Sequence, residues 1–198
     1  MNYLAHAYLS FHDPEVMVGN MVSDFIKGKK KFEYPETIQK GIALHRSIDL
    51  FTDAHEMTAV AKEIFRPAYR LYSGAIMDVI YDHFLAVDTD EFTEVSLLNF
   101  SNEVYGTLEA HVEWLPDRFA TMLPHMKAHN WLYNYRTRAG IERALGGLAR
   151  RALYIAEIDT AFRLFESNYQ LLQGYYRQFW RDLKPFAQAA YQQPGRNE

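Results

Sequence analysis

The sequence contains no cysteine among its 198 residues. Disulfide bonds, thiolate nucleophiles and cysteine-ligated zinc are therefore excluded, and the absence is compatible with a reducing compartment. No apolar run approaches the roughly 20 residues that a membrane-spanning helix needs. The start, MNYLAHAYLS, has no basic segment and its apolar run is interrupted by His6, so we expect neither a signal peptide nor an anchor. These absences predict a cytoplasmic protein without a membrane partner.

Neither sign of charge is in large excess, since the formal net charge is −4. Nothing global attracts the chain to nucleic acid, and any basic surface must be local. The glycine pair of GGLARR (146–151) is not followed by Lys-Ser or Lys-Thr, and no Gly-x-Ser-x-Gly occurs. The chain therefore has neither a phosphate-cradling P-loop nor a nucleophile elbow.

Hydrophobic residues make up 48% of the chain and aromatic residues 15%, which is enough for a sizeable core. Apolar residues recur at spacings of three and four, without a period-two run that would need a sheet. We predict an all-α protein, a single compact multi-helix domain over residues 1–191 with a frayed C-terminal tail at 192–198. The expected helices span residues 2–10, 15–28, 36–52, 56–66, 68–87, 92–112, 116–127, 137–150 and 153–190. The last helix carries an aromatic stripe that we interpret as core packing, Tyr169, Tyr175, Tyr176, Phe179 and Trp180.

Strongly polar side chains interrupt the segment IALHRSIDLFTD (42–53), which otherwise reads as a buried helix. His45, Asp49 and Asp53 are spaced four apart and so share one stripe, and Arg46 precedes Asp49 by three residues. The same interruption occurs in NYLAH (2–6), GNMVSDFIKG (19–28) and MDVIYDHFL (77–85). Nitrogen and oxygen ligands without sulfur suit Mn²⁺, Fe²⁺, Mg²⁺ or Zn²⁺. The four segments supply the pool His6, Asp24, His45, Asp49, Asp53, Asp78, Asp82 and His83.

Each of these residues, taken singly, also has a structural interpretation. His6 fits a satisfied, half-buried histidine, Asp53 fits a helix cap, and Asp78 fits an ion pair with Arg46 or Arg70. The joint pattern favours a site, because four segments within the first 85 residues place histidine or aspartate in apolar surroundings. Other histidines lack carboxylates at ligand spacing, and we interpret them as structural or surface residues: His12, His55, His111, His125 and His129.

The segment KGKKK concentrates four lysines, Lys27, Lys29, Lys30 and Lys31, directly after the GNMVSD segment. One interpretation is a solvated helix C-terminus that ends at Gly28. The other is a docking patch that attracts an acidic partner and weakens with salt.

Five blocks in order along the chain resemble the acyl carrier protein phosphodiesterases, also called acyl carrier protein hydrolases. The blocks are MNYLAH (1–6), GNMVSDFIKG (19–28), GIALHRSIDLFTD (41–53), DVIYDHFL (78–85) and YRTRAGIERALGGLARR (135–151). The resemblance implies an all-helical fold like a permuted HD-domain phosphohydrolase. It also implies a divalent metal, most typically Mn²⁺, with Mg²⁺ or Fe²⁺ as alternatives. The implied reaction hydrolyses the phosphodiester between 4′-phosphopantetheine and a serine of holo-acyl carrier protein.

The resemblance also implies roles for the polar residues. Asp24 matches the metal-associated aspartate of the family, and the expected metal ligands are His6, Asp24, His45 and Asp82. Arg46 is expected to clamp the phosphate, unless it forms a plain salt bridge to Asp49 or Asp53. The remaining residues are expected to act as base, as support for the ligands or as additional ligands: Asp49, Asp53, Asp78 and His83.

Two alternative functions stay open at the level of sequence. One is a metal phosphohydrolase of the same type that acts on a nucleotide or another small phosphodiester. The other is a non-catalytic helical module that binds an acidic partner, with the His/Asp cluster as an ion-pair network. The sequence leaves the oligomeric state open.

Overall fold

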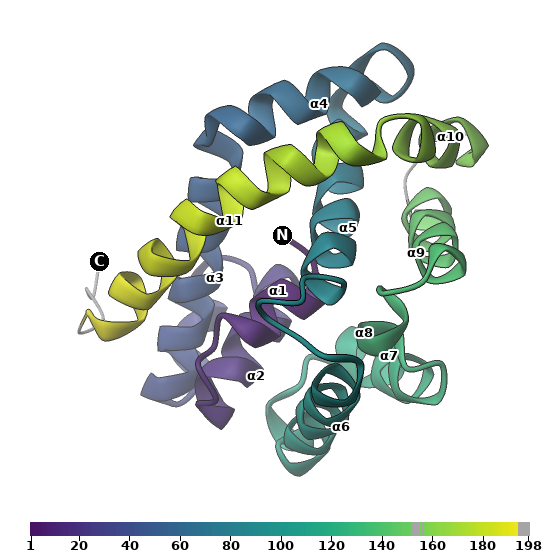
Figure 1. Cartoon of the computed structure of the whole chain (residues 1–198). Coiled ribbons are helices and arrows are strands. Elements are labelled where there is room, and N and C mark those ends of the chain that lie inside the picture. Colours follow the sequence, from purple (N-terminus) through teal and green to yellow (C-terminus); the bar gives the residue numbers. More distant parts are fainter. Residues whose placement is uncertain (152–154, 156, 194–198) are drawn as a thin grey trace.

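The computed structural model describes residues 1–151, 155 and 157–193, and every element in this part of the chain is helical. This confirms the predicted all-α class and the single compact domain (Figure 1). The α-helices are α1 (Tyr3–Tyr8), α2 (Pro14–Val22), α3 (Glu36–Ala54), α4 (Glu56–Tyr69), α5 (Ser73–Ala86), α6 (Glu94–Ala110), α7 (Asp117–Ala128), α8 (Trp131–Asn134), α9 (Arg138–Arg151), α10 (Asp159–Ser167) and α11 (Tyr169–Gln192). Short 3₁₀ helices are η1 (Ser23–Phe25), η2 (Gly28–Glu33), η3 (Arg70–Tyr72) and η4 (Val112–Trp114).

The N-terminal helix occupies the middle of the molecule, where the amino terminus lies close to α5 (Figure 1). Helix α1 packs against α2 and α5, and α2 packs along α3. Leu4, Ala5 and Ala7 are fully buried on α1, which explains why so short a helix is stable here. The candidate site residues before position 85 are therefore carried by helices that contact one another.

Helices α2 and α3 cross with their backbones in contact at two glycines. A Cβ atom at Gly19 would collide with the carbonyl oxygen of Ile38, and one at Gly41 would collide with the carbonyl oxygen of Val16. No residue with a side chain fits at either position without moving a helix. This close crossing brings the segment after Gly19 next to the segment after Gly41.

The long C-terminal helix α11 braces the N-terminal half by packing across α3, α4 and α5. Tyr176, Phe179 and Trp180 are buried on it, and Tyr169 and Tyr175 are partly buried against the same core. The interpretation of the aromatic stripe as core packing is confirmed.

The structure differs from several expected helix boundaries. The predicted break at Pro67 between the helices 56–66 and 68–87 is wrong, because Pro67 lies inside α4, which runs to Tyr69, and α5 begins only at Ser73. The predicted helix 15–28 ends at Val22 and continues as η1, and the lysine segment is η2 rather than the end of α2. The predicted helix 153–190 is divided into α10 and α11 at Asn168, whose side chain donates to the carbonyl oxygen of Leu164 at 2.8 Å, alongside the backbone N–H of the same residue, which donates to that oxygen at 3.1 Å. Helix α8 has only four residues and was not predicted.

The expected C-terminal tail and the expected last helix lie partly outside the described residues. Helix α11 extends to Gln192, and residues 194–198 of the expected tail lie outside the described residues, as do 152–154 and 156 of the expected last helix. Within the described residues, the search for a helix long and apolar enough to cross a membrane found none.

Candidate metal centre

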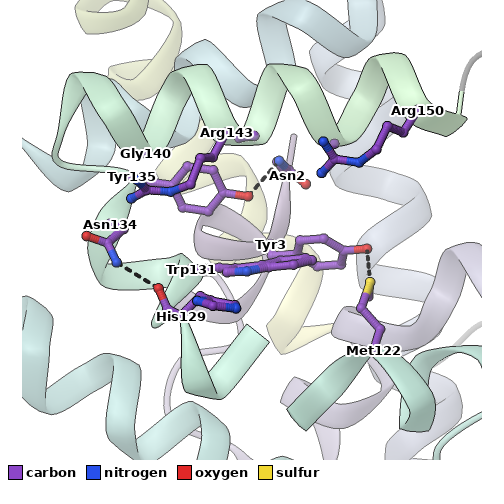
Figure 2. A pocket seen from close by; sticks show the side chains of 12 residues that line it. Asn2, Tyr3, Met122, His129, Trp131, Asn134, Tyr135, Gly140, Arg143 and Arg150 are labelled. Atoms are coloured by element: carbon purple, nitrogen blue, oxygen red, sulfur yellow. Dashed lines mark hydrogen bonds between the residues drawn. The ribbon is translucent and has the colours of Figure 1, made fainter. Parts of the chain in front are cut away.

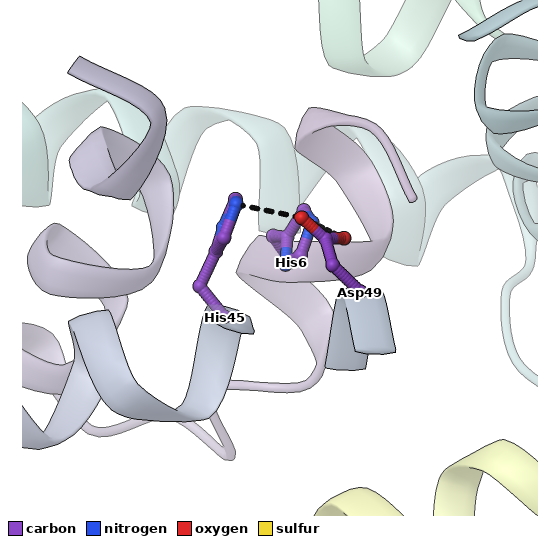
Figure 3. A group of neighbouring side chains, drawn as sticks. All are labelled: His6, His45 and Asp49. Atoms are coloured by element: carbon purple, nitrogen blue, oxygen red, sulfur yellow. Dashed lines mark ion pairs between the residues drawn. The ribbon is translucent and has the colours of Figure 1, made fainter. Parts of the chain in front are cut away.

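Two histidines and an aspartate from α1 and α3 converge in the interior (Figure 3). His6 comes from α1, and His45 and Asp49 come from successive turns of α3. One nitrogen or oxygen atom of each residue lies within 4.8 Å of the others. The two imidazole rings are stacked, with 3.9 Å between their centroids, and both residues are almost completely buried.

Asn20 fixes which nitrogen of each imidazole carries a hydrogen. Its side-chain Nδ2 donates to the carbonyl oxygen of His6 and to Ser10 Oγ, so its Oδ1 accepts from His6 Nδ1 at 2.8 Å. Its main-chain oxygen accepts from His45 Nδ1 at 2.7 Å. Both rings therefore carry hydrogen on Nδ1 and present Nε2 toward the carboxylates, the arrangement that metal-ligating histidines need.

The Nε2 atoms face carboxylate oxygens. His6 Nε2 is buried without a hydrogen-bond partner among the described residues, although Asp49 Oδ1 lies 3.3 Å away. His45 Nε2 lies 3.1 Å from Asp49 Oδ2 and 3.2 Å from Asp24 Oδ1. A lone pair directed at a carboxylate is stabilised only when a cation lies between them. The residues present therefore fit a divalent ion with imidazole and carboxylate ligands.

The pKa values of the two histidines in this group shift in opposite directions. Burial and the neighbouring His45 lower the pKa of His6 to about 4. Burial also opposes protonation of His45, but hydrogen bonds to Asp24 and Asp49 outweigh it and raise its pKa to about 9. Burial would raise the pKa of Asp49, yet the neighbouring His45 and His6 and the α-amino group of Met1 hold it well below its usual range. At neutral pH His45 is therefore protonated and His6 is neutral.

Asp24 lies at the rim of the group, since its side chain is 75% exposed. The hydrogen bond from His45 lowers the pKa of its carboxyl group, so Asp24 is ionised near neutrality. The structure therefore brings together three of the four expected ligands, His6, Asp24 and His45, beside Asp49, which the sequence offered as a base, as support or as an additional ligand.

Asp78 lies beside this group and contacts the α-amino group of Met1, whose nitrogen is 3.0 Å from Asp78 Oδ1 and 3.3 Å from Asp49 Oδ1. Burial lowers the pKa of this amino group, but the two aspartates reverse the effect and raise it to about 10. The expected alternative of an ion pair between Asp78 and Arg46 or Arg70 is not found in the described part of the chain.

Asp82 and His83 lie apart from the His6–His45–Asp49 group. Asp82 is fully buried, and its carboxylate accepts from the backbone N–H groups of Leu4 at 2.7 Å and Ala5 at 3.1 Å. It thereby anchors the start of α1, the helix that carries His6. The assignment of Asp82 as a metal ligand stays a prediction.

His83 contacts two residues that are distant in sequence, Tyr135 and Tyr169. Its Nδ1 donates to the carbonyl oxygen of Tyr135 at 2.7 Å, and its Nε2 lies 2.9 Å from the hydroxyl of Tyr169. Burial lowers the pKa of His83 to about 4, so the ring is neutral. Its predicted catalytic role remains a prediction.

Arg46 and Asp53 lie on α3 on either side of Asp49, three residues before it and four residues after it. Arg46 Nη2 donates to the carbonyl oxygen of Ile26 at 3.3 Å, two residues after Asp24. The expected alternative, a salt bridge from Arg46 to Asp49 or Asp53, is not found in the described part of the chain. Asp53 instead pairs with Lys62, 2.9 Å away.

Lys27, Lys29 and Lys30 are exposed on the segment that begins three residues after Asp24, and Lys31 lies over the ring of Phe32 at 4.8 Å. Gly28 has φ of +59°, which turns the chain into η2. Four lysines thus lie close in sequence to the rim of the site.

The sequence analysis did not assign roles to Asn20 or to the amino group of Met1. Asn20 was visible as a buried amide within the GNMVSDFIKG block, four residues before Asp24, but its hydrogen bonds depend on how α1, α2 and α3 meet. The contact of Met1 with Asp78 joins positions 77 residues apart and has no local sequence signal.

Comparisons with known proteins show the family to which the chain belongs. The family model described as "Acyl carrier protein phosphodiesterase" matches residues 1–183. The chain belongs to the acyl carrier protein phosphodiesterase family. The resemblance expected from the five sequence blocks is therefore confirmed, and the site described above is that of a member of this family of phosphoric diester hydrolases.

Curated relatives of this family cover nearly the whole chain. The acyl carrier protein phosphodiesterase of Yersinia pestis is 31% identical over 95% of this chain and 98% of its own. That of Photorhabdus laumondii is 30% identical over 91% of both chains. No solved structure matches the chain significantly, so the likeness to an HD-domain phosphohydrolase stays a prediction.

Proposed function

We propose that the protein hydrolyses the phosphodiester that joins 4′-phosphopantetheine to a serine of holo-acyl carrier protein. The observation that carries the proposal is the pair of buried Nε2 atoms, of His6 and His45, directed at Asp49 in a chain of this family. The products are apo-acyl carrier protein and 4′-phosphopantetheine. A water molecule supplies the oxygen that forms the new bond to phosphorus, the bond to the serine oxygen breaks, and that oxygen takes up a proton.

We assign separate roles in this reaction to the residues of the site. A divalent ion held by His6, His45, Asp49 and Asp24 would neutralise the phosphate and lower the pKa of the attacking water. Mn²⁺ is our first choice, with Mg²⁺ or Fe²⁺ as alternatives, because the ligands are imidazole and carboxylate. Asp24, ionised and exposed at the rim, would complete this ligand set on the side that faces solvent.

Arg46 is the candidate for binding the phosphate oxygens. Among the described residues its guanidinium donates one hydrogen bond, to the carbonyl oxygen of Ile26, which leaves further N–H groups for an anion. Asp78 pairs with the α-amino group of Met1 and Asp53 pairs with Lys62, so a basic group lies beside each carboxyl group and limits its repulsion of an anionic substrate.

Docking of the carrier protein is assigned to Lys27, Lys29, Lys30 and Lys31. Acyl carrier proteins are small and acidic, so a basic segment close in sequence to Asp24 would steer the prosthetic arm toward the site. The exposed positions of Lys27, Lys29 and Lys30 support this assignment.

The test is incubation of purified protein with holo-acyl carrier protein, with Mn²⁺ or with excess chelator, followed by mass spectrometry of the carrier. We expect loss of the phosphopantetheine mass only when metal is present. An unchanged carrier mass under every metal condition would contradict the proposal, and faster turnover of a small phosphodiester would favour the alternative substrate class.

The same assay tests the rim of the site through Asp24→Asn. This change removes the charge with little loss of packing, so we expect turnover to fall at least a hundredfold while the melting temperature stays close to that of the wild type. Asp90→Asn, in an exposed loop, is the matched control and should retain full activity. Normal turnover by Asp24→Asn would remove Asp24 from the mechanism.

A further inference from the structure

The structure contains a cavity of about 530 Å³ enclosed by α1, α7, α8 and α9 (Figure 2). Its volume lies within the range of sites that bury a small ligand. Two blocks of sequence meet there. Tyr135, Arg143, Gly147 and Arg150 come from the block YRTRAGIERALGGLARR, to which the metal centre assigns no role, and Asn2 and Tyr3 come from the first block.

The lining combines aromatic surface with N–H donors. Tyr3, Trp131 and Tyr135 supply the aromatic surface, and Arg143 and Arg150 lie seven residues apart on α9. None of the described lining residues is acidic, and neither arginine has an ion pair within the described part of the chain. Such a cavity suits a ligand that has apolar groups and several oxygen acceptors of its own.

The glycine pair of α9 gives Arg150 room to fold back along the helix. A Cβ atom at Gly146 would lie 3.5 Å from Arg150 Nη1, and one at Gly147 would lie 3.7 Å from Arg150 Nη2. Larger residues here would compete with the guanidinium and with any ligand for the same space.

The cavity is connected to the candidate metal centre by a continuous set of contacts. Tyr3 and His6 are three residues apart on α1 and so lie on neighbouring positions of one face. The ring of Tyr3 packs on Phe119 at 6.3 Å between centroids, and Phe119 packs on Phe25 at 5.4 Å. Phe25 directly follows Asp24, which lies at the rim of the centre.

We propose that this cavity binds the pantetheine arm of the substrate while the phosphate lies at the metal centre. The inference rests on the proposed function and extends it from the phosphate to the organic part of the substrate. The arm carries two amides, a hydroxyl and a dimethyl group. Arg143, Arg150 and Asn2 have N–H groups to donate to its oxygens, and the aromatic rings pack against its methyl groups.

The test fills the cavity with Gly147→Leu. The matched control is Gly106→Leu, on the exposed face of α6, where a Cβ atom would have no neighbouring atom within 4 Å. If Gly147→Leu does not fold, Met122→Trp fills the same cavity from the opposite wall on α7. Steady-state hydrolysis of holo-acyl carrier protein is measured with two inhibitors, pantetheine, which has the arm without phosphate, and inorganic phosphate.

We expect Gly147→Leu to raise KM for holo-acyl carrier protein and the inhibition constant of pantetheine at least tenfold. The inhibition constant of phosphate should change less than twofold, and Gly106→Leu should change none of the three. Unchanged values in a folded Gly147→Leu variant, or no inhibition of the wild type by pantetheine, would overturn the assignment of the cavity. A change in phosphate inhibition alone would assign the cavity to phosphate instead and also overturn it. These outcomes differ from a failure of the proposed function, in which the wild type would not hydrolyse holo-acyl carrier protein at all.

Discussion

Asn20 determines the chemistry of the two histidines in the candidate metal centre, although it contacts neither carboxylate. Its amide oxygen and its main-chain oxygen each accept from an Nδ1 atom, so the two rings present Nε2 on the same side. The amide is fully buried and also ties the main chain of His6 to Ser10. A single residue thus couples the packing of the first two helices to the orientation of both imidazole rings.

Replacing Asn20 separates this role from a simple contribution to stability. Asn20→Ala should weaken Mn²⁺ binding about 10- to 100-fold, because loss of the partner of a ligating histidine has effects of that size. Ser10→Ala removes another member of the same buried network without touching a ring nitrogen, and should leave Mn²⁺ affinity within about twofold while costing about 1 kcal/mol of stability. Isothermal titration with Mn²⁺ and urea unfolding measure the two effects. Equal Mn²⁺ affinity in both variants would contradict the role of Asn20.

The residue scale is also where the sequence was most informative and where it failed. Spacing alone placed His45 and Asp49 on one stripe of one helix, because a helix fixes the relation of positions four apart. It could not distinguish Asp49, which faces His6, from Asp53, one turn further, which pairs with Lys62. That choice depends on where α1 crosses α3, which no local pattern encodes.

At the scale of elements, the crossing of α2 and α3 positions the site. Gly19 and Gly41 allow the two helix backbones to touch. Asn20, directly after Gly19, and His45, four residues after Gly41, then lie within hydrogen-bond distance of each other. Wider separation of the helices would withdraw the main-chain oxygen of Asn20 from His45.

Gly41→Ala should therefore destabilise the protein by about 3 kcal/mol or more, since the added methyl group meets backbone atoms that cannot rotate away. The same change at Gly106, on an open face of α6, should stabilise the protein by about 0.8 kcal/mol through helix propensity. Urea unfolding followed by circular dichroism measures both. A Gly41→Ala variant as stable as the wild type would show that the two helices have room to separate.

A second interelement contact joins α1 to α11 through Glu91. Lys184 donates to its carboxylate at 2.6 Å and Trp180 at 2.8 Å, and the hydroxyl of Tyr8 also donates to it. Burial would raise the pKa of Glu91, but these three donors lower it below its ordinary value of 4.5. The ionised group therefore stabilises the folded state above about pH 4.5, and this contribution is lost as the pH falls through the lower pKa of the folded state.

Glu91→Gln should cost about 2 kcal/mol of stability at neutral pH, the size expected for hydrogen bonds to a charged group. The difference from the wild type should narrow as the pH falls below about 4.5, where the wild type loses the same charge. Glu103→Gln, at an exposed position, is the control. A difference that stays constant through the acidic range would mean that the charge of Glu91 does not stabilise the fold.

At the scale of the whole molecule, the helical class was predictable because three-and-four periodicity runs through almost the entire chain. The boundary errors are local. The last helix is interrupted at Asn168, and the lysine segment forms η2 instead of ending α2. The cavity beside α9 was not predictable, because its walls come from both ends of the first 150 residues.

The proposed docking of an acidic partner also belongs to the scale of the whole molecule, because it depends on how charge is distributed over the surface. Reversing the charges of Lys29, Lys30 and Lys31 to Glu should raise KM for holo-acyl carrier protein about tenfold at low salt and flatten its salt dependence, because steering is lost. Reversal of three exposed arginines on α10 and α11, Arg163, Arg177 and Arg181, changes the net charge equally and should have a smaller effect. Equal effects of the two triple variants would show that net charge, and not the lysine segment, attracts the carrier.

The most direct test of the account is a crystal of the protein grown with Mn²⁺ and measured at the manganese absorption edge. We predict an anomalous peak that contacts the Nε2 atoms of both His6 and His45 and a carboxylate oxygen of Asp49. A peak elsewhere, or none at the His6–His45–Asp49 group with the metal in excess, would contradict the claim that this group is the metal centre.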